Sequence, residues 1–373
     1  MTITATLPVA AYNGAALHFD HLELWVGNAK QAAEYYITAL GFRPLAYAGP
    51  ETGLTDRASY VVAQGEIRLV LTSALRPGGP INQHVARHGD GVRSVAFATP
   101  DAAGTFRHVV AHGAVPVLEP ALVEDGAGRA VLAAVGTYGD TIHTLVERSG
   151  SSGVWLPGFV AWNSPAHAAA PVGLLAIDHC VGNVGWGEMD RWCRFYADAF
   201  DFQELISFDD RDISTEFTAL RSKVMRNAGG SIKLPINEPA QGRKRSQIEE
   251  YLESYGGAGV QHVAIATGDI VATVRALKAN GVELLTTPAS YYDDLRTRVG
   301  EIDEDVATLR DLNILVDRDD RGYMLQIFTK PLQDRPTLFF EIIQRHGALS
   351  FGKGNFKALF VSIEKEQARR GNL

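Results

Sequence analysis

The sequence predicts an α+β fold of two tandem domains, each made of paired βαβββ modules that form a curved, open, barrel-like mixed sheet with helices outside. The first observation behind this expectation is an internal duplication. Residues 17–21 (Leu-His-Phe-Asp-His) and 175–179 (Leu-Ala-Ile-Asp-His) each open an apolar strand. Residues 89–99 and 257–267 each begin a further strand, with glycine and valine at matching places. A duplication of this size predicts two copies of one domain.

The second observation is that strand-like and helix-like segments alternate in the same order in both copies. A Val-Gly-Asn tripeptide follows the first strand in each copy and leads into a helix with paired aromatic residues, Tyr35-Tyr36 and Phe195-Tyr196. Two modules side by side form a curved sheet whose concave face encloses a cavity, so side chains from distant strands converge there. We expect helices over residues 29–40, 102–112, 188–199, 246–255, 270–280 and 355–370.

Two of these helices carry further signals. Ser246 and Glu249 form a capping box at the start of one helix, which should end before Gly256 and expose its polar face. The last helix follows a loop with three glycines and predicts either a lid over the cavity mouth or an ordinary packed terminal helix. One stripe of that helix is apolar and consists of Phe356, Leu359, Phe360 and Ile363.

Composition places the domain boundaries. We expect an N-terminal domain at 12–150, a linker at 151–171 and a C-terminal catalytic domain at 172–373. The linker segment is rich in glycine, serine, proline and alanine and almost free of charge. These are the marks of a connection between domains, and they predict that Trp155 and Trp162 are exposed.

Three matched positions of the two copies bear on chemistry, and the copies differ at two of them. The first strand has histidine in both copies, His21 and His179. The 89–99 alignment sets Ser94 opposite His262, and an alignment of Glu147-Arg148-Ser149-Gly150 with Gln344-Arg345-His346-Gly347 sets Thr144 opposite Glu341. The second copy therefore holds two imidazoles and a carboxylate where the first holds one imidazole and two hydroxyls. We expect a metal site in the second copy only.

Two histidines and one carboxylate on one face of a site leave neighbouring coordination positions open, as in non-haem Fe(II) oxygenases. The gaps of 83 residues (262 − 179) and 79 residues (341 − 262) require ligands from separate strands. Strand alternation places each ligand among inward-facing apolar neighbours, where an unpaired carboxylate is costly and a cation relieves the cost. Hydrolytic zinc sites use the same donors, so these residues alone leave iron and zinc open. His21 has no such partners and is interpreted as a structural histidine.

Composition excludes several classes of protein. The chain has 373 residues, ordinary for two globular domains, with 46% hydrophobic and 21% charged residues. A formal net charge of -8 argues against nucleic-acid binding. Two cysteines, Cys180 and Cys193, give no disulfide framework and favour a cytoplasmic location. Residues 1–12 show neither a signal peptide nor a membrane span.

Six blocks of the second copy, taken in order, are specific enough to indicate a family. The chain resembles bacterial members of the 4-hydroxyphenylpyruvate dioxygenase family, within the vicinal oxygen chelate (glyoxalase and bleomycin-resistance-like) superfamily, from about Ala15 to the C-terminus. The blocks are Leu-Pro-Ile-Asn-Glu-Pro at 234–239, Lys-Arg-Ser-Gln-Ile at 244–248, Gly-Ala-Gly-Val-Gln-His at 257–262, Leu-Gln-Ile-Phe-Thr-Lys-Pro at 325–331, Asp-Arg-Pro-Thr at 334–337 through Glu-Ile-Ile at 341–343, and Phe-Gly-Lys-Gly-Asn-Phe at 351–356.

The resemblance implies that His179, His262 and Glu341 are catalytic and hold one Fe(II) per chain, and that the first domain has no metal site. It implies conversion of 4-hydroxyphenylpyruvate and O2 to homogentisate and CO2 in tyrosine catabolism, through oxidative decarboxylation, ring hydroxylation and side-chain migration. We also expect a homo-oligomer. The resemblance further implies a substrate pocket lined by Ser222, Pro235, Asn237, Gln247, Gln261, Gln326, Phe328, Phe339, Asn355 and Phe356.

Three alternatives remain at this point. A 4-hydroxymandelate synthase would use the same substrate and ligands but hydroxylate the benzylic carbon. An extradiol dioxygenase of the same superfamily would cleave a catechol ring without any 2-oxo acid. A non-catalytic module that binds aromatic ligands would have no need of the full trio.

Overall fold

The computed structural model describes residues 12–149, 153–163, 170–209, 215 and 217–372. The segment that bears on a signal peptide lies almost entirely outside these residues. The strands are β1 His18–Trp25, β2 Arg43–Ala48, β3 Arg57–Gln64, β4 Ile67–Ala74, β5 Gly91–Ala98, β6 Val115–Asp125, β7 Gly128–Gly136, β8 Ile142–Ser149, β9 Val160–Ala161, β10 Leu174–Asn183, β11 Gln203–Phe208, β12 Ala219–Arg226, β13 Lys233–Ala240, β14 Gly259–Thr267, β15 Leu315–Asp319, β16 Gly322–Phe328 and β17 Phe339–His346.

The helices connect or cover these strands. The α-helices are α1 Ala29–Leu40, α2 Pro80–His88, α3 Ala102–Ala111, α4 Met189–Phe200, α5 Gln247–Tyr255, α6 Ile270–Ala279, α7 Leu295–Val299, α8 Val306–Leu312 and α9 Phe356–Arg369. Short 3-10 helices are η1 Gly14–Ala16, η2 Pro50–Thr52, η3 Ala289–Tyr292 and η4 Lys353–Asn355. In the part of the chain that is described, no helix has both the length and the apolar character that crossing a membrane requires.

The predicted βαβββ module occurs four times. One sheet has the strand order β6-β7-β8-β5-β1-β4-β3-β2-β9, and the other has β11-β12-β13-β10-β14-β17-β16-β15. In each sheet the two modules join through their first strands, because β1 pairs antiparallel with β5 and β10 with β14. The two tandem mixed sheets confirm the predicted fold class.

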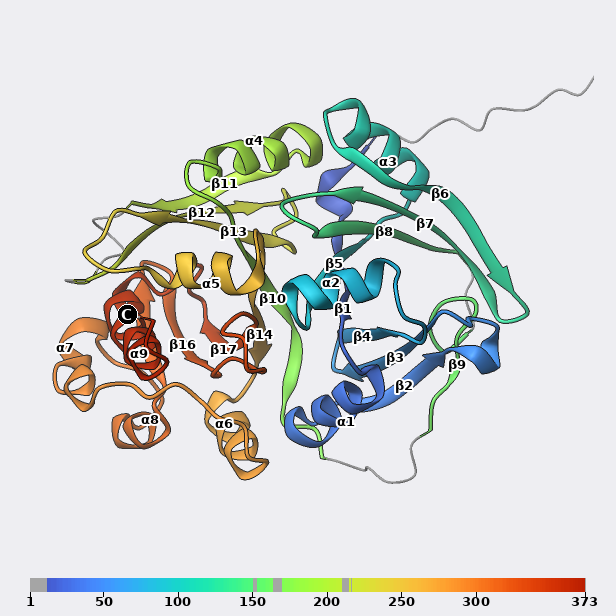
Figure 1. Ribbon diagram of the computed structural model, residues 1–373. Helices are drawn as coiled ribbons and strands as arrows, with labels where there is room; N and C mark the ends of the chain where they lie inside the picture. The colour runs from blue at the N-terminus through green and yellow to red at the C-terminus, as the bar shows by residue number, and fades with distance from the viewer. Residues whose placement is uncertain (1–11, 150–152, 164–169, 210–214, 216, 373) are drawn as a thin grey trace, which may run out of the picture.

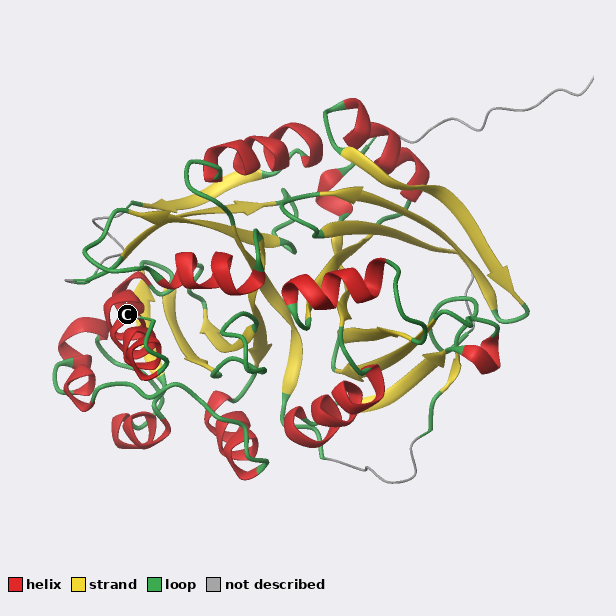
Figure 2. Cartoon of the chain, in the orientation of Figure 1, coloured by secondary structure: helices red, strands yellow, loops and turns green. Residues whose placement is uncertain are grey.

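The two sheets lie side by side and curve, with most helices on their outer faces (Figure 1). Figure 2 shows helices α2 and α5 near the junction of the sheets, where they meet. One cluster of buried apolar side chains runs through both halves, from Leu22 and Phe97 in the first to Ile236 and Phe340 in the second. The halves therefore share a core, which holds the concave faces in place.

Most predicted helices occur within one residue of their expected ends. The capping box of α5 is confirmed, since Ser246 Oγ accepts from the backbone N–H of Glu249 and the Glu249 carboxylate accepts from that of Ser246. The expectation that the polar face of α5 is exposed was wrong for Glu250. That carboxylate is buried because Arg370 and Asn372, at the end of the chain, donate hydrogen bonds to it. Helices α2, α7 and α8 were not expected.

The predicted linker is partly outside the described residues, at 150–152 and 164–169. Its described part is less open than expected. Strand β9 pairs with β2, and Trp155 is buried under the guanidinium of Arg148, whose central carbon lies 4.5 Å from the ring centroid. Trp162 is half-buried against Tyr60. The exposure predicted for both tryptophans was therefore wrong, and the domain boundaries stay a prediction.

Candidate metal centre and its cavity

Three neighbouring strands at the middle of the second sheet position the predicted ligands. His179 lies on β10, His262 on β14 and Glu341 on β17. Glu341 Oε2 lies 3.3 Å from Nε2 of His179 and 3.5 Å from Nε2 of His262. The fold thus brings together three side chains that are about 80 residues apart in sequence. They form a group able to hold a metal ion.

Strand pairing confirms the alignment of the two copies. His262 lies opposite Phe339 on the parallel neighbour of β14, and Ser94 lies opposite Ile142 on the parallel neighbour of β5. Two residues further along each partner strand are Glu341 and Thr144. In the first copy the Ser94 and Thr144 hydroxyls lie 2.8 Å apart and hydrogen-bond to each other. A neutral hydroxyl pair thus replaces the two missing ligands.

Each histidine of the candidate centre is oriented by the residue that precedes it. Nδ1 of His179 lies 2.7 Å from Asp178 Oδ1, and Nδ1 of His262 lies 3.0 Å from Gln261 Oε1. These contacts require irregular strands, because strict alternation would turn neighbouring side chains to opposite faces. The pairing of β10 with β14 shifts at Ile177/His179 and again where Val181 opposes His262 but Gly182 opposes Val260. Bulges at these points explain how Gln261 and His262 both reach the cavity.

The hydrogen bonds fix the tautomers and test the fit of a cation. Because Asp178 and Gln261 offer acceptor oxygens, each Nδ1 donates, and in a neutral ring each Nε2 then carries a lone pair. Both lone pairs face Glu341, which also only accepts. A cation bonded at about 2.1 Å would separate neighbouring ligand atoms by roughly 3.0 to 3.4 Å, close to the observed distances. The donor set and its spacing therefore fit a divalent metal.

The carboxylate is held in its charged form. Burial by itself raises the pKa of Glu341, but without a metal ion the protonated rings of His179 and His262 outweigh burial through charge and hydrogen bonds and lower this pKa to about 2. A bound cation would take the place of these protons. Asp178 is buried as well. Burial raises its pKa, but His179 and the two-pronged contact of Arg345 together hold that pKa well below the usual value. The site is therefore built to keep a buried anion beside two ring nitrogens.

A cavity opens beside the trio, and its wall is mostly apolar with a few polar side chains, as in sites that bind small organic ligands. Its wall includes every predicted pocket residue except Asn355; that they bind substrate stays a prediction. All four residues of the predicted apolar stripe of α9 are part of this wall. The lining residues are His179, Val181, Phe208, Leu220, Ser222, Val224, Pro235, Asn237, Gln247, Gln261, His262, Gln326, Phe328, Phe339, Glu341, Phe351, Phe356, Leu359, Phe360 and Ile363.

Asn355 is the one predicted pocket residue that lies outside the cavity wall. Its side chain is fully buried at the start of α9 and is not part of the cavity wall. Its Oδ1 accepts a hydrogen bond from the hydroxyl of Tyr291, at 2.6 Å, and its backbone N–H donates to Gly352. This position supports a structural role in seating the terminal helix.

Several apolar wall residues were not predicted. Strand alternation would have predicted Val181, which lies two residues after His179 and so shares its face. Phe351 packs against His179 with ring centroids 5.0 Å apart, and Phe208 packs against Phe356 at the same distance. The sequence carries no signal for Phe208 or Leu220, because their place in the wall depends on how the terminal helix docks.

Comparison with known proteins places the chain. The model of the Glyoxalase/Bleomycin resistance protein/Dioxygenase superfamily matches residues 18–141 and 176–327, one match in each half. A 4-hydroxyphenylpyruvate dioxygenase of Yarrowia lipolytica is 48% identical over 367 residues, covering 95% of this chain and 93% of the relative. One of Xenopus tropicalis is also 48% identical and covers 96% of this chain and 94% of the relative. The chain belongs to the 4-hydroxyphenylpyruvate dioxygenase family.

A solved structure agrees with this placement. A triply substituted 4-hydroxymandelate synthase from Streptomyces coelicolor superposes with a TM-score of 0.84, at 37% identity, covering 94% of this chain and 98% of that one. As a member of the 4-hydroxyphenylpyruvate dioxygenase family, the chain is more similar to its named dioxygenase relatives than to this synthase. The family is an enzyme family, so the trio and its cavity are a candidate active site.

Proposed function

We propose that this chain converts 4-hydroxyphenylpyruvate and O2 to homogentisate and CO2, as a step of tyrosine catabolism. The observation that carries the proposal is the His179, His262 and Glu341 trio at the wall of a mostly apolar cavity, in a chain 48% identical to dioxygenases named for this substrate. Atoms balance without a further reductant, since decarboxylation of the 2-oxo acid side chain supplies the electrons.

We propose Fe(II), one ion per chain, as the metal that these three residues hold. Zinc fits the donor set equally well, but it has no redox chemistry. A ferrous ion bound by two histidines and a carboxylate has open positions for the 2-oxo acid and for O2, and activates O2 for oxidation. The named relatives are dioxygenases, which favours the redox-active ion.

The remaining wall residues are proposed to orient the substrate and to exclude water. Ser222, Asn237 and Gln326 present polar groups from β12, β13 and β16, and neutral groups of this kind hydrogen-bond a phenol without a charge penalty. Phe328 and Phe339 pack around His262, with Phe339 stacked on its ring at 4.9 Å between centroids. Such aromatic walls keep water away from a strongly oxidising reaction.

Oxygen uptake tests the proposal. The full-length chain, loaded anaerobically with Fe(II), should consume O2 only when 4-hydroxyphenylpyruvate is added, and homogentisate and CO2 should form in equal amounts. Glu341→Ala should fold but lose turnover, whereas Thr144→Ala, at the repeat-equivalent position of the first half, should retain it. Uptake without homogentisate, or equal loss in both variants, would contradict the proposal.

The synthase reaction is the main competing function, because a 4-hydroxymandelate synthase gives the structural match at a TM-score of 0.84. Both reactions start from one substrate and consume the same O2, so only the product separates them. A hydroxylated ring with a migrated side chain supports our proposal, and a benzylic alcohol supports the synthase. An extradiol dioxygenase would turn over a catechol without any 2-oxo acid.

We further propose that the chain is a cytoplasmic homo-oligomer. Both cysteines are free and buried, which suits a reducing compartment. Strand β6 forms an edge of the first sheet and exposes Val115, Val117, Leu118 and Leu122. An exposed apolar edge of this kind is typical of an interface between copies.

A further inference from the structure

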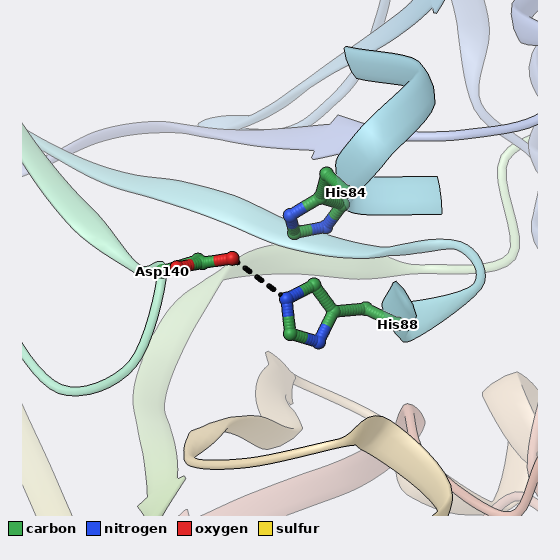
Figure 3. Close-up of side chains that lie close together, drawn as sticks. All are labelled: His84, His88 and Asp140. Carbon is green, nitrogen blue, oxygen red and sulfur yellow. Dashed lines mark hydrogen bonds and ion pairs between the residues drawn. The ribbon is translucent and has the colours of Figure 1, made fainter. Parts of the chain in front are cut away.

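A second group of metal-type ligands lies outside the cavity, in the first half. His84 and His88 are one turn apart on α2, and Asp140 lies in the turn between β7 and β8. One ligand atom from each lies within 4.8 Å of the other two. Figure 3 shows both rings beside the Asp140 carboxylate, with Nε2 of His88 2.8 Å from Asp140 Oδ2. Histidines at i and i+4 on one helix face are a common arrangement in zinc sites.

The unusual member is His84. Its side chain is 4% exposed, and within the described residues neither of its ring nitrogens has a hydrogen-bond partner. A buried polar group without a partner is costly, so this ring is a neutral imidazole with a free lone pair. Its ring centroid lies 4.6 Å from that of His88, so a nitrogen of each ring could bind the same metal ion.

His88 is oriented as metal ligands usually are. Its Nδ1 donates to the backbone carbonyl of Tyr255, at the end of α5 in the other half. A ligand histidine typically gives its second N–H to such a carbonyl and offers the other nitrogen to the metal. Here the other nitrogen, Nε2, faces Asp140, which only accepts. Either an additional proton or a cation must therefore separate the two acceptors.

The fold itself does not demand imidazoles at these positions. Counting back from the glycines that end the helices, Gly89 and Gly256, His84 and His88 correspond to Tyr251 and Tyr255 in the second half. Those two tyrosines are buried and stack at 5.1 Å between centroids. The first half therefore places ligand atoms where the second half uses aromatic rings alone.

Charged groups of both signs surround these three side chains. Arg93 contacts the backbone carbonyl of Asp140 and lies over the ring of Trp25. Burial lowers the pKa of Arg93, and the nearby charges of Asp140 and Glu23 oppose that effect. Arg87 also lies near Asp140, so a bound ion would share this carboxylate with two guanidinium groups. The side chain of Asp140 is 45% exposed, which gives an ion a path from solvent and lets the carboxylate move.

We propose that His84, His88 and Asp140 form a second metal site, which binds Zn²⁺ with water as the remaining ligand. Two imidazoles and a carboxylate on a borderline divalent ion are a recurrent zinc donor set. Binding would join α2 and the β7–β8 turn, both in the first half, next to the contact of His88 with Tyr255. The metal thus stabilises the junction of the halves, and this role does not depend on the proposed function.

The test uses Co²⁺ as a spectroscopic probe in the full-length Glu341→Ala chain, whose cavity trio has lost its carboxylate. We expect one equivalent of Co²⁺ to give the intense visible absorption of four-coordinate cobalt, and Zn²⁺ to abolish it and raise the Tm. Adding His84→Phe, which keeps an aromatic ring against Trp25, or Asp140→Asn, on the half-exposed turn, should each remove both effects.

The cavity provides an independent readout. His84→Phe and Asp140→Asn in the otherwise unchanged chain should retain Fe(II)-dependent oxygen uptake. The proposal is overturned if the Glu341→Ala chain binds no stoichiometric Co²⁺, or if the cobalt absorption persists after both substitutions. Either result would leave the His88 and Asp140 contact as a plain ion pair.

Discussion

The hydroxyl of Tyr196, on α4 of the second half, lies 2.9 Å from Nε2 of His143, on β8 of the first half. The repeat-equivalent contact runs the opposite way. Tyr36, on α1 of the first half, packs edge to face against Phe340 on β17, with ring centroids 6.1 Å apart. In each half, an aromatic side chain from a helix therefore packs on the sheet of the other half. This exchange explains why a single apolar core spans both halves.

His143 makes stability depend on pH. Its ring is fully buried, and Nδ1 donates to the Val95 carbonyl. Burial lowers its pKa from the usual 6.5 to about 4. Below pH 6.5 the His143 ring is protonated in the unfolded chain but stays neutral in the folded chain until the pH approaches 4. The folded chain therefore loses stability relative to the unfolded chain as the pH falls from 6.5 towards 4. The loss reaches roughly 3 kcal/mol when both states are protonated.

Urea unfolding at about pH 7.5 and about pH 5 measures this effect. Other groups titrate in the same pH range, so the unchanged chain is compared with the His143→Phe variant. Phenylalanine is chosen because it is the residue at the repeat-equivalent position, Phe340. We expect the unchanged chain to lose about 2 kcal/mol more than the variant at the lower pH. Equal losses in the two chains would show that His143 does not carry this dependence.

Asp178 is predicted to set metal affinity without binding the metal. It accepts from Nδ1 of His179 and from both prongs of Arg345, and it pairs with Lys233 at 3.1 Å. Asp178→Asn removes the charge that makes His179 a stronger ligand. We expect Fe(II) affinity to fall by roughly 10- to 100-fold, measured by anaerobic titration.

The first half supplies the matched control. Asp20 accepts from His21 and from Arg148 in the same pattern, but among the described residues it adjoins no ligand trio. Asp20→Asn should disturb packing to a similar degree and leave Fe(II) affinity unchanged. If both variants lose the same affinity, the effect is one of folding and the positioning role of Asp178 is rejected.

The sequence predicted those parts of the structure that are repeated or locally specified. The duplication was enough to choose His179, His262 and Glu341, because a difference between copies stands out against a shared pattern. The cavity position of Gln261 depends on a bulge in β14, which alternation alone does not predict. Helix α2 begins after two glycines and a proline and lacks the side-chain N-cap that marks the equally long α5.

The proposed oligomer makes a prediction for β6. Leu122 is 57% exposed on this edge strand, beside the exposed Val117 and Leu118. Leu122→Lys places a charge in the proposed interface, so the mass from light scattering should fall to the 40.4 kDa of one chain. Leu75→Lys alters a similarly exposed leucine elsewhere in the first half and should leave the assembly intact. An unchanged mass for Leu122→Lys would place the interface on another surface.

A buried ion pair contributes to the docking of α9, beside the hydrogen bonds of Glu364 with Thr218 and of Ser362 with Thr286. Arg370 donates three hydrogen bonds to Glu250 on α5, through Nε and Nη2, with Nη2 at 2.7 Å from Oε2. Arg370→Gln leaves this buried carboxylate without its cation, at a cost of about 1–3 kcal/mol to the docked helix. Since the Phe356 and Phe360 rings of α9 form part of the cavity wall, we expect faster hydrogen exchange across residues 356–369 and a higher KM for the substrate.

The neighbouring Arg369 is exposed and pairs only with Glu366 among the described residues, so Arg369→Gln should change neither the exchange nor the KM. Faster exchange in Arg370→Gln with an unchanged KM would show that α9 is a packed terminal helix, and slow exchange in both variants would show that the ion pair does not hold it.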